Sequence, residues 1–186
     1  SGPDTEPKRA AAIDSHIKNM ETLAGRLHRD GVRLILIGPS PYDQTGSQSE
    51  ENLFGVNDAL KSCGAAARRL AEKLNAGWVD FNAPMEAINR EWQVRQPGFT
   101  VVGPDRVHPG PAGHLVMAYL FLKAQHAPAI VAEVTLDGRR GEVVGHANCG
   151  VSDIRVADGT LTFTCRAAAL PFPVDKACGP ALEWVP

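Results

Sequence analysis

Asp105 and His108 are the residues of this sequence best suited to do chemistry. They lie three positions apart, in the run Asp105-Arg106-Val107-His108-Pro109, just before an apolar segment that should be helical. A carboxylate three residues before a histidine can accept a hydrogen bond from the imidazole Nδ1–H, which leaves Nε2 to act as a general base. We therefore predict His108 as the base and Asp105 as the group that orients it. The alternative is that Asp105 caps a turn and His108 is an ordinary surface histidine.

The sequence around this pair resembles one enzyme family. Residues 105–114 are similar to the last sequence block of the SGNH (GDSL-type) esterases and lipases, where Asp-x-x-His supplies two members of a Ser-His-Asp triad. Residues 37–43 resemble the strand end and loop that lie between the third and last blocks of that family. The resemblance covers about residues 8–126. It implies hydrolysis of a small-molecule or carbohydrate ester, without a metal or an organic cofactor.

The loop at residues 37–43 contributes two further candidate site residues. Ser40 and Tyr42 follow an aliphatic strand, and strand ends of open α/β sheets form the rim of the active site. We predict that both contact the substrate. Ser40 as the nucleophile is the less favoured alternative, because members of the family carry such a segment and a separate nucleophilic serine.

Two blocks that the resemblance calls for are absent from the sequence. The Gly-Asp-Ser nucleophile block is missing, and so is the block whose glycine would donate to the oxyanion. Gly55-Val56-Asn57-Asp58 has the letters of the third block, but it follows a polar loop and opens a helix, so we predict Asn57 as a helix N-cap. The serine is therefore expected from a missing N-terminal segment or from a second chain that completes the sheet. The competing hypothesis is a non-catalytic carbohydrate- or partner-binding module derived from the same fold.

The hydrophobic pattern of residues 1–127 predicts alternating helices and strands. Helices are expected over 7–29, 56–74 and 84–95 and from about 111 to 125, the last of them well buried; strands are expected over 32–37 and 78–81. Gly77 is placed to end the second helix. This alternation predicts part of a doubly wound, flavodoxin-like parallel sheet in three layers, as in the SGNH fold.

Residues 128–186 have a different pattern. Two Asp-Gly pairs, at 137–138 and 158–159, lie between alternating segments and predict β-hairpins. We expect a small antiparallel β appendage that ends in a proline-rich tail. Cys149 and Cys165 lie in this strand-rich region, where they are candidates for one disulfide.

Composition and charge exclude several classes of protein. The 186 residues are 44% hydrophobic and carry a net charge of −2, and no run of Lys or Arg exceeds two residues, so a nucleic-acid groove is not indicated. The most apolar stretch, residues 115–124, is too short to span a bilayer. The four cysteines form no Cys-x-x-Cys pair, so a zinc site is not indicated either. The resemblance favours a soluble bacterial enzyme of the periplasm or the exterior.

Overall fold

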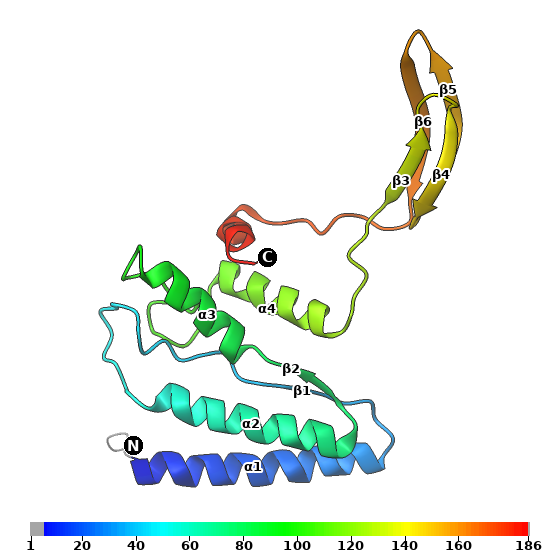
Figure 1. Cartoon of the computed structure of the whole chain (residues 1–186). Coiled ribbons are helices and arrows are strands. Elements are labelled where there is room, and N and C mark those ends of the chain that lie inside the picture. The colour runs from blue at the N-terminus through cyan, green and yellow to red at the C-terminus, as the bar shows by residue number, and fades with distance from the viewer. Residues whose placement is uncertain (1–5, 186) are drawn as a thin grey trace. The chain divides into compact units, whose positions relative to one another are not determined.

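A computed structural model describes residues 6–185 and divides them into two units (Figure 1). The first unit contains residues 6–125 and 175–185, and the second contains His126–Val174. The expected appendage began at residue 128 and ran to the end of the chain. The structure instead groups residues 175–185 with the first unit, because this tail packs into the hydrophobic core there.

The first unit places helices on both sides of a short pair of strands. Figure 1 shows helices α1 and α2 on one side of strands β1 and β2, and helices α3 and α4 on the other. The elements are α1 (Glu6–Arg29), β1 (Ile35–Ile37), α2 (Val56–Leu74), β2 (Gly77–Val79), α3 (Asn82–Gln93), α4 (Pro111–Ala124) and the 3₁₀ helix η1 (Lys176–Glu183). The predicted helices and strands are therefore all present, with the strands shorter than expected.

Strands β1 and β2 run parallel, with Leu36 opposite Trp78 and Ile37 opposite Val79. Successive side chains point to opposite faces, so each face packs against a different helix layer. Leu36 contributes to one hydrophobic cluster with residues of α1 and α2. Val79 contributes to the other, which includes Met85 of α3 and Val116 of α4. Together with the helices on either side, the two strands form a mixed α/β unit. A wider doubly wound sheet remains a prediction.

The ends of helix α2 differ from the predicted ones. Asn75, in the left-handed conformation at φ 51°, caps the C-terminus, and its N–H donates to carbonyls of the last turn. Gly77 lies beyond this cap and begins β2. At the other end the N-cap is Gly55 at φ 91°, without a side-chain cap, so the prediction of Asn57 as the N-cap was wrong. The left-handed region of φ favours glycine, so Gly55 can occupy the N-cap position without steric strain.

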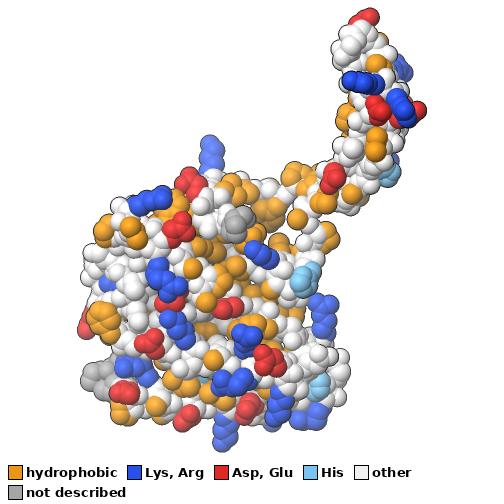
Figure 2. Space-filling model, viewed as in Figure 1, with side chains coloured by type: hydrophobic (Ala, Val, Ile, Leu, Met, Phe, Trp, Pro, Cys, Tyr) orange, Lys and Arg blue, Asp and Glu red, His pale blue; other side chains and the backbone are white. Residues whose placement is uncertain are grey.

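Helix α4 is less buried than its apolar sequence suggests. Only Gly113 and Val116 are fully buried, and Leu122 is 49% exposed. Ile37 at the end of β1 is also exposed, although the sequence predicted a strand buried on both faces. Figure 2 shows apolar side chains among the charged ones on the surface of this unit.

Within residues 6–185, no helix combines the length and apolar character that a membrane span requires.

The C-terminal tail completes the core of the first unit. Ala181 of η1 is fully buried, and Trp184 lies against two aromatic rings near the end of α3. Its ring centroid is 5.0 Å from that of Phe99 and 6.5 Å from that of Trp92, both in edge-to-face orientation. Such pairs stabilise beyond the area they bury. Contacts with this aromatic cluster hold the C-terminal tail in place. No local sequence pattern predicted these contacts.

The second unit consists of two antiparallel hairpins, as predicted. Strands β3 (Glu133–Asp137) and β4 (Glu142–Ala147) form one, and β5 (Cys149–Ala157) and β6 (Thr160–Ala167) form the other. Asp158 and Gly159 connect β5 to β6 with φ of 50° and 74°. Two successive residues with positive φ are what the two-residue hairpin turn requires.

Cys149 and Cys165 lie on this second hairpin. Cys149 pairs with Ala167 and Cys165 with Val151, so the two thiols are diagonal neighbours on one face of the ladder. Both are free thiols in the structure. The Cys149 Sγ lies 3.2 Å from the carbonyl oxygen of Glu133.

Candidate active site

The loop between residues 102 and 111 carries the two residues predicted to do chemistry. Its ends are fixed, because Val102 is buried in the core and α4 begins at Pro111. The Gly103 N–H donates to the His108 carbonyl at 2.7 Å, and the Arg106 N–H donates to the Gly103 carbonyl at 2.8 Å. A Cβ at Gly103 would lie 2.6 Å from the His108 carbonyl oxygen, so only glycine fits there. The loop is therefore a closed turn with a defined backbone.

Asp105 and His108 face each other across this turn. Asp105 Oδ2 lies 2.7 Å from His108 Nδ1, the length of a charge-assisted hydrogen bond. The other carboxylate oxygen accepts from the His108 N–H at 3.0 Å and the Val107 N–H at 3.1 Å. Asp105 thus caps its own turn and orients the imidazole at the same time. The predicted contact between the two side chains and the turn cap of the alternative interpretation are therefore both present. The role of His108 as a base remains a prediction.

The His108 ring projects from the protein. Its side chain is 83% exposed, against 50% for Asp105. Because Nδ1 is hydrogen-bonded to the carboxylate, the other ring nitrogen, Nε2, points away from the loop. Within residues 6–185, no hydroxyl group is hydrogen-bonded to Nε2. The arrangement can accept a proton from an alcohol, but this part of the chain does not supply the alcohol.

The hydrogen bonds lower the pKa of Asp105 from its ordinary value of 3.8 to about 2. The His108 N–H is the largest cause, followed by the His108 ring and the Val107 N–H. A lowered carboxyl pKa means that these bonds stabilise the fold fully above pH 3.8 and lose their contribution as the pH falls through about 2. Asp105 is therefore a carboxylate throughout the neutral range.

We predict that the Asp105 carboxyl carbon titrates near pH 2 when followed by ¹³C NMR. In His108→Ala the ring contribution is lost but both backbone donors remain. The pKa should then rise only part of the way from about 2 to 3.8. A midpoint at 3.8 in the unmodified protein would show that the turn is open in solution.

The loop after β1 holds the two predicted substrate-binding residues in different environments. Tyr42 is 5% exposed, and its hydroxyl donates to the Glu51 carbonyl at 3.2 Å and accepts from the Leu53 N–H at 2.8 Å. Both partners belong to its own loop, so Tyr42 fastens that loop and its hydroxyl is occupied. Ser40 is partly exposed between two prolines. Of the two, Ser40 alone has a surface that a substrate can reach.

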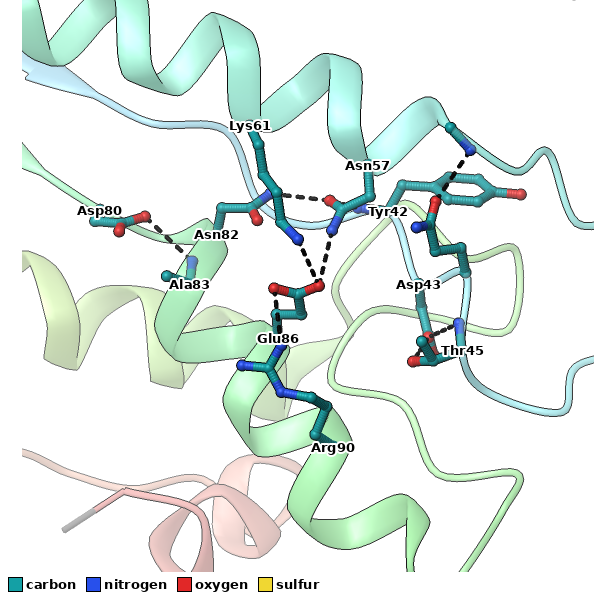
Figure 3. Close-up of polar contacts among 12 residues, drawn as sticks. Tyr42, Asp43, Thr45, Asn57, Lys61, Asp80, Asn82, Ala83, Glu86 and Arg90 are labelled. Carbon is teal, nitrogen blue, oxygen red and sulfur yellow. Dashed lines mark hydrogen bonds and ion pairs between the residues drawn. The ribbon is translucent and has the colours of Figure 1, made fainter.

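Asn57 lies at the centre of a buried polar network (Figure 3). It is 1% exposed, and its Oδ1 accepts from the Tyr42 N–H at 3.1 Å and from Asn82 Nδ2 at 3.0 Å. Its Nδ2 donates to Glu86 Oε1 at 3.3 Å, and Lys61 pairs with the same carboxylate oxygen at 2.8 Å. The network joins α2, α3 and the loop after β1. The Asn57 side chain therefore connects these three segments. The exclusion of its motif as an oxyanion element remains a prediction.

Two buried charged residues next to the site were not singled out from the sequence. Asp43 is 2% exposed and Arg106 is 4% exposed. The Asp43 Oδ1 accepts from the N–H groups of Thr45 and Gly46 at 3.0 and 2.9 Å. Burial raises the pKa of Asp43, but hydrogen bonds led by that from Gly46 outweigh it and hold this pKa below its ordinary value. A carboxylate in the loop that follows an aliphatic strand was the available signal for Asp43.

The described residues contain no cluster of three or more His, Cys, Asp or Glu side chains that could hold a metal ion. The only acid–histidine pair at hydrogen-bond distance within residues 6–185 is Asp105 and His108. This pair presents an imidazole that is oriented by a carboxylate.

A similar arrangement of helices and strands occurs in solved structures that are named as esterases. The chain superimposes on a variant of an acetyl-xylooligosaccharide esterase from Geobacillus with a TM-score of 0.50 and 20% identity, over 63% of this chain and 49% of that one. An acetyl xylan esterase gives a TM-score of 0.50 and 19% identity over 60% of this chain and 55% of its own. These likenesses show an esterase-like fold.

A more similar structure is that of a gut microbial diltiazem-metabolizing enzyme. It matches with a TM-score of 0.88 and 32% sequence identity over 99% of this chain. The match covers 44% of that enzyme, so the present chain spans less than half of its length. No protein-family model and no curated protein matches the sequence.

Proposed function

We propose that this chain is the acid–histidine part of a serine ester hydrolase of SGNH type. The observation that carries the proposal is the 2.7 Å contact between Asp105 Oδ2 and His108 Nδ1, with the rest of the imidazole open to an incoming group. The similarity of the fold to esterases supports it. The partial coverage of the diltiazem-metabolizing enzyme supports a nucleophile that lies outside residues 6–185.

In the proposed reaction a serine from a further segment or a second chain approaches His108. As the serine oxygen bonds to the ester carbonyl carbon, Nε2 takes the hydroxyl proton and the Asp105 carboxylate stabilises the imidazolium. The carbon–oxygen bond to the alcohol then breaks, and His108 returns the proton to the departing alkoxide. Water repeats both steps on the acyl-serine and releases the acid.

The substrate class we propose is an acyl ester of a small molecule or carbohydrate. Two of the similar structures are named as esterases of acetylated xylan or xylo-oligosaccharide, so acetyl esters are the first substrates to assay. Ser40, on the loop after β1, is the candidate substrate contact within this chain, because its side chain is partly exposed.

A fluorophosphonate probe tests the proposal directly. Such a probe bonds covalently to a serine that has been activated by a neighbouring base. In the complete assembly that contains this chain, we expect one serine outside residues 6–185 to be labelled, and labelling to be lost in His108→Ala. Labelling of Ser40 would move the nucleophile into this chain. Absence of labelling in an assembly that binds carbohydrate would favour the non-catalytic module.

A further inference from the structure

Arg106 is a buried arginine between two exposed residues of the turn that carries Asp105 and His108, here called the dyad turn. It is 4% exposed, whereas Val107 is 42% exposed and the Asp105 side chain 50% exposed. Its side chain therefore turns into the protein while the neighbouring carboxylate turns outward to His108. A buried guanidinium requires partners for its N–H groups, since an unpaired buried charge is strongly destabilising.

The hydrogen-bond partners of this guanidinium are main-chain carbonyls of one loop, residues 43–50. Nη1 donates to the carbonyls of Asp43 at 2.9 Å and Gly46 at 3.0 Å. Nε donates to that of Glu50 at 3.1 Å, and Nη2 to that of Gln48 at 3.3 Å. Because arginine presents its donors in a rigid planar fork, one side chain can hold four carbonyls at once.

The main chain of Arg106 is also hydrogen-bonded to this loop. The Asp43 N–H donates to the Arg106 carbonyl at 2.9 Å. Five hydrogen bonds thus join residue 106 to the loop that follows β1. This loop is the one that carries Ser40 and Tyr42 and that begins at the carboxyl end of the strand.

Arg106 also has a backbone conformation that favours glycine. Its φ is 70°, in the left-handed region, where a side chain is strained. This conformation lets the Arg106 N–H reach the Gly103 carbonyl and lets Asp105 accept from the N–H groups of Val107 and His108. A strained non-glycine residue persists where the surrounding contacts fix it. The four carbonyl contacts of the side chain supply that fixation.

We propose that Arg106 is a positioning residue, which ties the Asp105–His108 turn to the loop after β1 and so holds the carboxylate against the imidazole. Its relevance to catalysis rests on the proposed function. The positioning itself is independent of that function, because it concerns the hydrogen bonds of Asp105, which can be measured without any substrate.

Two substitutions separate the side chain from the backbone strain. Arg106→Gly removes the guanidinium and relieves the positive φ, so a loss of order cannot come from strain. Arg106→Lys keeps the charge, but a single ammonium group cannot reach all four carbonyls. Asp158→Gly, at φ 50° in the β5–β6 turn, is the matched control for removing a side chain at positive φ, and Arg68→Lys, on the exposed face of α2, is the control for the change of cation.

The principal measurement is the Asp105 titration by ¹³C NMR. In Arg106→Gly we expect the pKa to rise from about 2 towards 3.8, with amide hydrogen exchange of Val107 and His108 accelerated at least tenfold. Arg106→Lys should give a smaller change in the same direction, and neither control should move Asp105. A folded Arg106→Gly variant with an unchanged Asp105 pKa and unchanged exchange would overturn the proposal.

A measurement on the unmodified protein covers the case in which both Arg106 variants unfold. The side-chain N–H groups of Arg106 should exchange with solvent at least tenfold more slowly than those of exposed Arg68. Equal exchange rates would overturn the proposal without any mutation. In the complete assembly, Arg106→Lys should lower kcat more than it changes KM. If His108→Ala keeps full activity while Arg106→Gly still shifts Asp105, the proposed function fails and the positioning role stands.

Discussion

Replacing His108 with alanine should lower kcat for hydrolysis of p-nitrophenyl acetate by about 10⁴-fold in the complete assembly. The substitution removes the group that takes the serine proton, and no second histidine within residues 6–185 is paired with a carboxylate to replace it. KM should change little, because the imidazole acts on the transition state and contributes little to binding of the ester. Initial rates over a range of substrate concentrations separate the two constants.

His114 provides the matched control for this substitution. It lies six residues further on, in the first turn of α4, and its side chain is exposed. His114→Ala removes an imidazole from the same region without touching Asp105, so activity should stay within about twofold of the unmodified protein. If His108→Ala retains more than about a tenth of the activity, His108 is not the base.

Asp105 and His108 could be found from the sequence because the contact between them is local. The turn is closed by hydrogen bonds that span three to five residues, and the carboxylate reaches the imidazole from the third position before it. The hairpin turn at Asp158-Gly159 was predictable for the same reason, since the dipeptide itself favours positive φ. Such features are set by residues that are neighbours in the chain.

The structural roles of Arg106 and Tyr42 could not be predicted from the sequence, because their hydrogen-bond partners depend on the fold; contact of Tyr42 with a substrate remains a prediction. The carbonyls that Arg106 binds lie 56 to 63 residues earlier in the chain, and main-chain carbonyls have no sequence signature. Tyr42 follows a strand end, which favours a site residue, but its hydroxyl is taken up within its own loop. The return of Trp184 to the core likewise depends on its ring contacts with Trp92 and Phe99. These placements follow from tertiary packing and not from local pattern.

Replacing Gly113 with alanine should destabilise the first unit by about 3 kcal/mol. A Cβ at this position would overlap the Val101 carbonyl oxygen and lie 2.8 Å from the Cβ of Pro109. Neither neighbour can move easily, because Val101 is 2% exposed in the core and its N–H donates to the buried Asn89 side chain at 2.7 Å. Alanine gains about 1 kcal/mol in helix propensity over glycine, but a clash with backbone outweighs it. Urea denaturation should show a lower midpoint with an unchanged slope.

Gly25→Ala makes the same chemical change where there is room for it. Gly25 lies inside α1, and a Cβ there would meet only the end of the Arg29 side chain, at 3.7 Å. This variant should be more stable than the unmodified protein by up to about 1 kcal/mol, so the two substitutions should move the midpoint in opposite directions. Because Gly113→Ala pushes α4 away from Val101 and Pro109, it should also displace the His108 turn and raise the pKa of Asp105. If Gly113→Ala is as stable as Gly25→Ala, helix α4 does not approach residue 101 as closely in solution. The inference that this contact fixes the position of the turn carrying Asp105 and His108 would then be wrong.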